Sequence, residues 1–381
     1  MKLLHTSDWH VGKLIRGRSR ADEHRAVLAE MAGVAADEAV DLVLVAGDLF
    51  ETSAPGPESE EIVYRGLLGL AEVAPVVVIG GNHDNPRRLD AVAPLLSLGR
   101  VTVLGRPAAP DDGGVVRLDA GGTPVQLALL PFVSKRNVVR AEQLMAADAY
   151  EHSQAYDDRL RQVIARLCDG FDADSVNVVC AHAFAAGGTA GGGERSVHTI
   201  EDYSVGSQAF PVGAQYVALG HLHRAQDIPG PTRIHYSGSP LQLDFGEDRD
   251  TKSVAVVELA PGVPAAVRDV PLTAGRQLRT LRGSLAELEA AAGSTGDAYL
   301  RVVVNDSRRA GLADMVRSWY PHCVDVVVRP PDEASPSAAR TGEPVVGRQP
   351  GELFRAYLDT TDLTDPRVAA AFDELLEEVA S

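Results

Sequence analysis

Short hydrophobic runs rich in β-branched residues alternate with helical or loop segments through the first two thirds of the chain. This alternation is typical of an α/β or layered α+β domain. The runs at 42–45 (LVLV) and 76–79 (VVVI) are apolar on both faces, as expected of central strands that are covered on both sides. Strands are predicted at residues 2–6, 41–46, 75–79, 125–130, 176–180, 216–219, 234–236 and 253–259.

Helical spacing precedes the second strand and returns later in the chain. The residues that share one face of the first predicted helix are Val27, Leu28, Met31, Val34 and Ala35. The pattern changes near residues 261–276, after which 277–328 are predicted to form a small separate α/β unit. Its expected elements are helices at 284–292 and 310–319 and strands at 299–304 and 324–328.

The last fifty residues differ in composition from the rest. Residues 330–350 are rich in Pro, Ser, Ala, Gly and Thr, which is typical of a flexible linker. Helical spacing resumes at 352–358 and 366–379, and Asp365-Pro366 supplies a helix start. The apolar positions of this tail are Phe354, Leu358, Val368, Phe372, Leu375, Leu376 and Val379. Such a helix either packs back on its own chain or docks on a partner.

Composition narrows the class of protein. The chain has 381 residues with 36 basic and 53 acidic side chains, a net charge of −17, which argues against nucleic-acid binding by bulk charge alone. No stretch approaches the roughly 18 apolar residues of a membrane span, and we expect no secretory signal. Three scattered cysteines are typical of a reducing cytoplasm, where we expect the protein to act.

Five hydrophobic, strand-like runs are each followed at once by Asp, Asn or His. These polar clusters are Asp8-Trp9-His10, Gly47-Asp48, Gly81-Asn82-His83-Asp84, His182 and Gly220-His221-Leu222-His223. Ligands of open α/β sheets bind beyond the carboxyl ends of the strands, so the five clusters can converge on one site. Each cluster alone is more often structural than functional, but five in this order favour a functional site.

The side chains in these clusters suit divalent metals. Carboxylate, imidazole and amide donors without a thiolate select manganese, iron or zinc. Seven candidate ligands exceed the needs of one ion and fit two, with one carboxylate bridging: Asp8, His10, Asp48, Asn82, His182, His221 and His223. Paired metals of this kind promote attack on a phosphorus–oxygen bond. His83 would then protonate the leaving oxygen, with Asp84 orienting its ring.

The ordered set D-x-H, G-D, G-N-H-D, H and G-H-x-H resembles the calcineurin-like metallophosphoesterase superfamily. Longer stretches resemble the bacterial SbcD family of exonuclease subunits: LLHTSDWHVGK, VLVAGDLFETSAP, VVVIGGNHD, YVALGHLHRAQ and IHYSGSPLQLDFGED. The resemblance is strong over residues 1–259. It implies a two-sheet αββα sandwich at 1–270, a small DNA-binding capping domain at 277–330, a linker at 331–350 and a helical tail at 351–381.

The resemblance also implies roles for individual residues. Asp8, His10 and His223 would hold one manganese ion. Asn82, His182 and His221 would hold the other, and Asp48 would bridge the two. His83 would be the catalytic histidine. The tail helices would bind the coiled coil of an SbcC-like ATPase, which would hydrolyse the ATP, and the chain would form a homodimer within a heterotetramer.

Basic residues near the first cluster are candidate DNA contacts. Lys13, Arg16, Arg18 and Arg20 could meet phosphates, or could belong to a solvated loop and helix start. Lys135 and Arg136 are weaker candidates for the same role. The glycine-rich stretch at 185–193 lacks the Lys-Ser/Thr ending of a P-loop, so we expect this chain not to use ATP itself.

The ligand clusters predict a dimetal phosphodiesterase, and the resemblance implies a DNA nuclease subunit with 3′-to-5′ exonuclease, single-strand endonuclease and hairpin-opening activities in DNA repair. A small-molecule or cyclic-nucleotide phosphodiesterase of the same superfamily would share every metal ligand, so the core motifs leave this alternative open. The residues after the catalytic domain favour the nuclease, because a small-molecule enzyme would not need them. A binding scaffold without catalysis is the third possibility.

Overall fold

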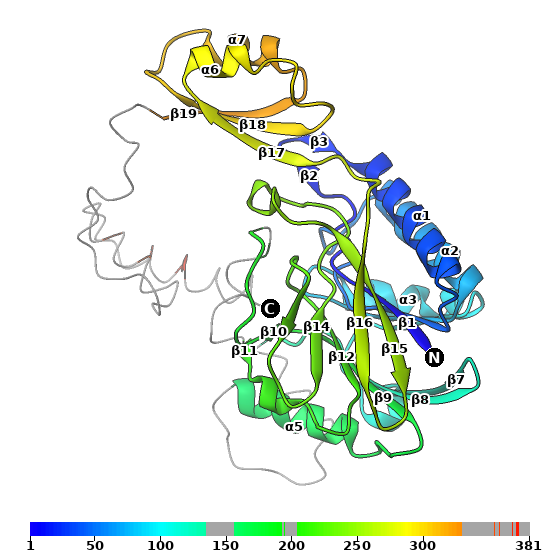
Figure 1. Ribbon diagram of the computed structural model, residues 1–381. Helices are drawn as coiled ribbons and strands as arrows, with labels where there is room; N and C mark the ends of the chain where they lie inside the picture. Colours follow the sequence, from blue (N-terminus) through cyan, green and yellow to red (C-terminus); the bar gives the residue numbers. More distant parts are fainter. Residues whose placement is uncertain are drawn as a thin grey trace.

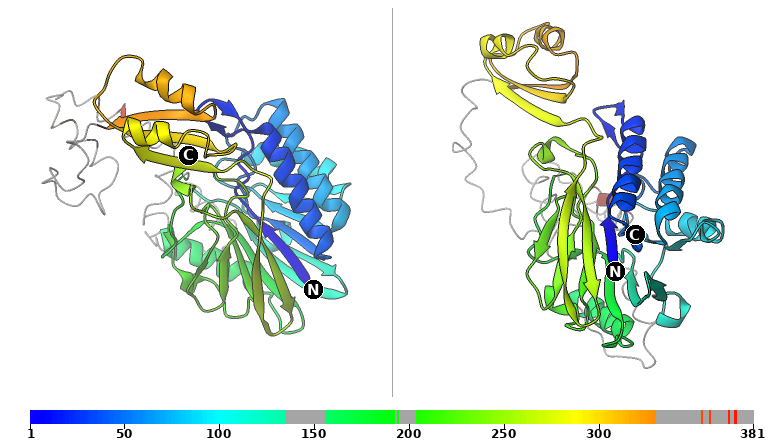
Figure 2. Two further views of the ribbon diagram at one scale, coloured as in Figure 1. Left: turned by 45° about the horizontal axis from the view of Figure 1, so that its top comes forward. Right: turned by 45° about the vertical axis from the view of Figure 1, so that its right-hand side comes forward.

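The structure is a computed structural model that describes residues 1–134, 156–192, 194, 204–329, 354, 358, 368, 371 and 372. Two six-stranded sheets face each other and form a sandwich (Figures 1 and 2). The first sheet has the order β16-β15-β1-β4-β5-β6. Its strands are β1 (Lys2–Thr6), β4 (Leu42–Val45), β5 (Val76–Ile79), β6 (Val101–Leu104), β15 (Ser253–Ala260) and β16 (Val263–Pro271).

The second sheet has the order β13-β14-β12-β9-β8-β7. Its strands are β7 (Val115–Ala120), β8 (Thr123–Leu130), β9 (Val176–His182), β12 (Tyr216–Gly220), β13 (Gln226–Ile228) and β14 (Arg233–Tyr236). The central strands of both sheets run parallel to their neighbours, so their carboxyl ends meet at one end of the sandwich. Short pairs outside these sheets are β2 (Leu14–Ile15) with β3 (Arg18–Ser19), and β10 (Phe184–Ala185) with β11 (Ser204–Val205).

Helices cover the outer face of each sheet. The elements α1 (Ala21–Asp37), α2 (Pro57–Val73) and α3 (Pro86–Ser97) lie on the first sheet, and α5 (Tyr156–Cys168) lies on the second. One apolar cluster fills the space between the sheets and includes Leu44, Val77, Leu127 and Val178. Because both faces of the central strands are buried, their sequences are apolar throughout. The layers confirm the predicted αββα sandwich.

A smaller three-stranded sheet lies at the end of the sandwich, beside the β2–β3 hairpin (Figure 1). Its parallel strands are β17 (Leu278–Gly283), β18 (Tyr299–Asn305) and β19 (Cys323–Arg329), covered by α6 (Leu285–Ala290) and α7 (Leu312–Trp319). We call residues 278–329 the small unit. Its joint with the sandwich is an apolar cluster of Ile15, Phe245, Leu278 and Tyr299.

The eight strands predicted in the first two thirds of the chain are confirmed, as are the two helices and two strands predicted in the small unit. The sequence pattern did not reveal β6, β7, β13, β16, β17, α2 or α5, nor the two-residue strands β2, β3, β10 and β11. Three one-turn 3₁₀ helices complete the described structure: η1 (Pro110–Asp112), η4 (Ser207–Ala209) and η5 (Phe245–Glu247). No helix within the described residues is long and apolar enough to cross a bilayer.

Candidate metal centre

The seven candidate ligands lie at the carboxyl ends of five parallel strands and face one another across the end of the sandwich. They are Asp8 and His10 after β1, Asp48 after β4, Asn82 after β5, His182 at the end of β9, and His221 and His223 after β12. All except Asn82 are at most 2% exposed. The topology therefore gathers residues that are more than 200 positions apart in the chain into one buried cluster.

The backbone at this cluster is strained. Four of the candidate ligands have the left-handed φ values that favour glycine: Asp8 (54°), His10 (47°), Asp48 (53°) and His221 (106°). A Cβ atom on Gly81 would lie 2.2 Å from Asp48 Oδ1, so only glycine allows this approach. Strained backbone of this kind costs free energy and persists only where the surrounding structure enforces it. It is concentrated at functional sites.

His10 and His223 face each other with their Nε2 atoms 3.1 Å apart. Each ring contacts a carboxylate through Nδ1: His10 contacts Glu51 Oε2 at 2.9 Å, and His223 contacts Glu247 Oε1 at 3.1 Å. Because a carboxylate accepts, each Nδ1 carries the hydrogen and each Nε2 presents a lone pair. Two lone pairs at this distance repel unless a proton or a cation lies between them. The Asp8 carboxylate completes a group of three donors that fits one metal ion.

A second group of donors adjoins the first. Asn82 Oδ1 lies 2.9 Å from both His182 Nε2 and His221 Nδ1. His182 donates its Nδ1 hydrogen to the Ala46 carbonyl at 2.8 Å, so its Nε2 lone pair faces the electron-rich amide oxygen. An oxygen and a nitrogen that both present lone pairs are stabilised by a cation between them.

Asp48 lies between the two groups. Its Oδ2 atom is 3.5 Å from His10 Nε2 and 3.5 Å from His182 Nε2, while Oδ1 accepts the His83 backbone N–H at 2.8 Å. The candidate groups of donors share this carboxylate: Asp48 joins His10 and His83 in one, and Asp8 and His182 in another. The residues present therefore fit two divalent ions with Asp48 between them.

The electrostatics of the cluster favour bound cations. Burial would raise the pKa of Asp48, but three neighbouring histidine rings hold it well below its usual range. Burial lowers the pKa of His10 despite the nearby carboxylates of Glu51 and Asp48. Burial would lower the pKa of His223 as well, yet the carboxylates around it, with Glu247 foremost, raise it on balance. A divalent ion would replace the proton that this arrangement favours on His223.

His83 lies beside the cluster, with its ring centroid 4.6 Å from that of His10. The prediction that Asp84 orients this ring is wrong. Asp84 instead accepts backbone N–H groups of Leu49, Phe50 and Gly81 at 2.9–3.3 Å, because the turns after β4 and β5 need a buried acceptor there. Burial, with the nearby Asp48 charge, raises the pKa of Asp84 above its usual range. The ring of His83 donates its Nδ1 hydrogen to the Glu51 carbonyl at 2.7 Å.

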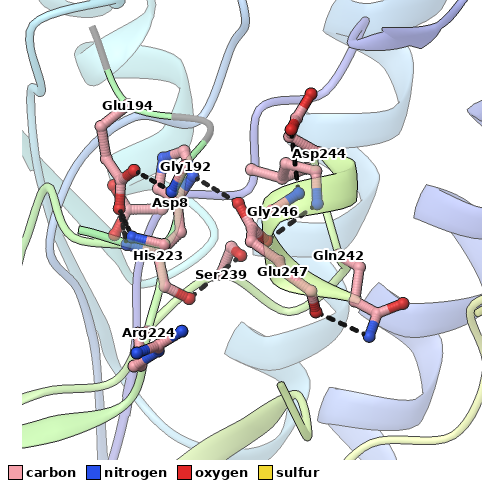
Figure 3. A network of polar contacts seen from close by, with 12 residues as sticks. Asp8, Gly192, Glu194, His223, Arg224, Ser239, Gln242, Asp244, Gly246 and Glu247 are labelled. Atoms are coloured by element: carbon pink, nitrogen blue, oxygen red, sulfur yellow. Dashed lines mark hydrogen bonds and ion pairs between the residues drawn. The ribbon is translucent and has the colours of Figure 1, made fainter. Parts of the chain in front are cut away.

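Three carboxylates at the cluster were absent from the sequence prediction: Glu51, Glu194 and Glu247. Glu194 Oε1 accepts the backbone N–H of His223 at 3.0 Å. Figure 3 shows Glu194 and Glu247 on either side of His223. Glu51 follows Asp48 by three positions, and Glu247 lies in the segment SGSPLQLDFGED, so proximity to a motif was the only signal for either.

The candidate DNA contacts have different environments. Lys13 pairs with Glu51 at 2.8 Å, Arg16 pairs with Asp325 of the small unit at 3.0 Å, and Arg18 is exposed. The prediction that Arg20 contacts DNA is wrong. Its side chain is buried, pairs with Glu23 at 2.6 Å and donates to the backbone carbonyls of Gln242 and Arg276. It therefore connects the start of α1 to two segments far along the chain. Lys135 and Arg136 lie outside the described residues.

The tail is described at only a few positions. The rings of Phe354 and Phe372 stack with centroids 3.9 Å apart, so the two predicted helical pieces meet there. Leu358 is buried and Val368 is half-buried. The remaining predicted partner contacts, Leu375 and Leu376, lie outside the described residues.

Comparison with known proteins places the chain in a family. The model of the calcineurin-like phosphoesterases matches residues 1–225. A second model, described as the type 5 capsule protein repressor C-terminal domain, matches residues 274–362. Among solved structures, a 5′-nucleotidase precursor from Thermus thermophilus aligns with 72% of this chain and 54% of its own at 14% identity. Its TM-score of 0.39 is too low to support an inference.

Curated relatives are more informative. The SbcD subunit of the SbcCD nuclease from Bacillus subtilis is 35% identical over 73% of this chain and 71% of its own. The SbcD subunit from Rhodobacter capsulatus is 35% identical over 71% and 69%, and that from Escherichia coli K12 is 29% identical over 76% and 73%. The phosphoesterase model matches more than half of this chain, and these relatives align over more than two thirds of their own length. The chain therefore belongs to the SbcD family of calcineurin-like phosphoesterases.

Proposed function

We propose that this chain is the catalytic subunit of a DNA nuclease that acts in DNA repair and uses two divalent ions. The observation that carries the proposal is the pair of facing nitrogens, His10 Nε2 and His223 Nε2, with the Asp48 carboxylate 3.5 Å from His10. Asp8, His10 and His223 would hold one ion, and Asn82, His182 and His221 the other. Two ions at such a site supply charge neutralisation for a phosphodiester and lower the pKa of a water molecule.

In this proposal the residues around the ions orient the reacting groups. Asp48 would fix the spacing of the two groups of donors, and its Oδ1 holds the backbone of His83 in place. Because His83 donates from Nδ1 to the Glu51 carbonyl, Nε2 is the atom through which the ring would pass a proton to the leaving oxygen. Asp84 would stabilise the turns that carry Asp48 and His83 and take no part in proton transfer.

Manganese is the proposed metal. The donor set consists of carboxylate, amide and imidazole groups, and the three cysteines are buried and free. Donors of this kind suit manganese better than the softer ions that thiolates select.

The proposed substrate is DNA, because the relatives are named as nucleases. We propose 3′-to-5′ exonuclease, single-strand endonuclease and hairpin-opening activities. The catalytic domain would span 1–270 and the capping domain 277–330, with Arg18 and Lys13 near the path of the phosphates. Arg18 is exposed on the β2–β3 hairpin, which lies beside the small unit in Figure 1.

We also propose that the tail at 351–381 binds an SbcC-like coiled-coil ATPase, which would hydrolyse the ATP. The names of the relatives imply a complex of two kinds of subunit. The stacked Phe354 and Phe372 rings would contribute to that contact, and Leu358, which is buried within this chain, would hold the tail in place. A homodimer within a heterotetramer would form through α3 and its C-cap residue, where Leu95 and Leu98 are 71% and 85% exposed.

A manganese-dependent cleavage assay on hairpin DNA, with and without the ATPase and ATP, tests the proposal. We expect cleavage by the wild type and its loss in Asp48→Ala with the fold retained. Cleavage of cyclic nucleotides but not DNA would favour a small-molecule phosphodiesterase. Failure to take up any metal would favour a scaffold.

A further inference from the structure

The segment at 237–248 (SGSPLQLDFGED) contains none of the candidate ligands, yet it connects the small unit to the metal centre. We propose that Gln242 is a positioning residue that couples the placement of the small unit to His223, through Glu247. The proposal rests on the dimetal function proposed above and deepens it. We call the hydrogen-bonded chain Leu278–Gln242–Glu247–His223 the relay.

Gln242 forms the first link. Its side chain is 8% exposed, and both ends of its amide are used. Oε1 accepts the backbone N–H of Leu278, the first residue of β17, at 2.7 Å. Nε2 donates to the carbonyl of Glu247 at 2.9 Å and to that of Asp250 at 3.0 Å. One amide thus joins the first strand of the small unit to the backbone of the residue that contacts His223.

Glu247 forms the second link (Figure 3). Its side chain is fully buried, and Oε1 contacts His223 Nδ1 at 3.1 Å. Oε2 accepts from the Leu243 backbone at 2.9 Å and pairs with Lys252 at 2.8 Å. With both oxygens directed at partners, the carboxylate has one orientation, and a shift of its backbone moves the His223 ring.

Phe245 strengthens the same connection. It lies in η5 with Glu247, is 3% exposed and packs on Ile15, Leu278 and Tyr299 at the joint with the small unit. The Arg301 guanidinium of β18 lies 4.6 Å from the centroid of its ring. A single turn of 3₁₀ helix therefore places one side chain in the joint and another against a candidate ligand.

The relay makes a specific prediction about the two groups of donors. It ends at His223, so it acts on the ion held by Asp8, His10 and His223. Its members make no contact with the Asn82 and His182 group among the interactions described here. Coupling between two sites is reciprocal, so an ion bound at His223 must also stabilise the placement of β17.

The experiment measures Mn²⁺ binding by the full chain, using electron paramagnetic resonance of free Mn²⁺, in the wild type and Gln242→Leu. Repeating both titrations in an Asn82→Ala background isolates the His223 site. The matched control is Asn177→Leu. Asn177 is also a buried amide that donates to two carbonyls, at 2.6 and 3.2 Å, but it lies near the start of β9, away from His182 at its other end.

We expect Gln242→Leu to weaken Mn²⁺ binding at the His223 site about tenfold, and Asn177→Leu to change it less than about twofold. Gln242→Glu keeps the acceptor for Leu278 and loses the donor to Glu247. Gln242→Glu should therefore weaken Mn²⁺ binding as well, and it serves as the test variant if Gln242→Leu fails to fold. In hydrogen exchange, Mn²⁺ should slow the amides at the start of β17 in the wild type and not in the Gln242 variants.

Failure of the wild type to bind Mn²⁺ would overturn the proposed function and the relay together. Binding by the wild type with unchanged affinity in both Gln242 variants would overturn the relay alone. An equal loss in Asn177→Leu would also overturn it, because the effect would then follow from general destabilisation.

Discussion

His10 and His223 are 213 positions apart in the chain, and their Nε2 atoms lie 3.1 Å from each other. The outer nitrogen of each ring contacts a buried or half-buried glutamate, Glu51 or Glu247, which fixes the hydrogen on Nδ1. Without a proton or a cation between the two nitrogens the arrangement is costly, because two lone pairs then face each other beside the Asp8 and Asp48 carboxylates. This relationship links the fold to the proposed chemistry.

Glu51→Gln should weaken Mn²⁺ binding about tenfold, because a neutral amide is a poorer acceptor for His10 Nδ1 and makes its Nε2 a weaker ligand. Titration of the purified chain with Mn²⁺ measures this. Lys13→Met is the control, since it removes the 2.8 Å pair with Glu51 and leaves the contact with His10. Equal weakening in both variants would contradict the assigned role of Glu51.

Acid should destabilise the fold through Glu247. Burial would raise its pKa, but Lys252 and His223 lower it from the ordinary 4.5 to about 2. A depressed folded pKa contributes stability above pH ~4.5 that is lost as pH falls toward ~2, here on the order of 3 kcal/mol. The free energy of unfolding in urea, measured from roughly pH 6 to pH 3, should fall less steeply with decreasing pH in Glu247→Gln than in the wild type. Parallel declines would contradict this account.

Arg20 and Arg18 should behave differently although they are two residues apart. Arg20→Met should lower the free energy of unfolding by about 3 kcal/mol, because it leaves the Glu23 carboxylate without its buried partner. Arg18→Ala should change stability by less than about 0.5 kcal/mol and weaken DNA binding. Urea unfolding and DNA titration at several salt concentrations test both. A stable Arg20→Met with weakened DNA binding would restore the sequence prediction.

Leu98→Glu should convert the proposed dimer to a monomer and leave Mn²⁺ binding unchanged, since a charge on this exposed apolar face opposes self-association. Light scattering after size exclusion gives the mass. Val212 is a matched control because it is 78% exposed and precedes β12 of the other sheet, so Val212→Glu should remain dimeric. A wild type that is monomeric at all concentrations would contradict the α3 proposal.

The central strands and five polar clusters could be predicted from sequence because each strand is apolar on both faces and each cluster follows it directly. β16 was missed because it is an edge strand whose exposed residues include Pro264 and Pro271. β16 is therefore determined by tertiary packing more than by local pattern. α5 was missed although its buried residues Tyr156, Leu160, Val163, Ile164 and Leu167 recur at helical spacing, so the local pattern was sufficient to predict it.

The supporting carboxylates could not be predicted for a different reason. Glu51 and Glu247 contact the Nδ1 atoms of His10 and His223, which are distant from them in the sequence. Such contacts leave no periodic signal in the sequence. The error at Arg20 has a related origin, since its partner Glu23 is three positions away on a helix start that looks solvated. Asp84 was assigned to its neighbour His83, whereas three N–H groups of the two turns around it need its oxygens.

The central claim is that the chain holds two ions with Asp48 between them. Equilibrium dialysis against Mn²⁺, followed by metal analysis, tests it most directly. We predict two Mn²⁺ per chain in the wild type and fewer than two in Asp48→Asn, with both proteins equally folded by circular dichroism. A wild-type chain that retains no Mn²⁺ or one ion, or an Asp48→Asn chain that still retains two, would contradict it.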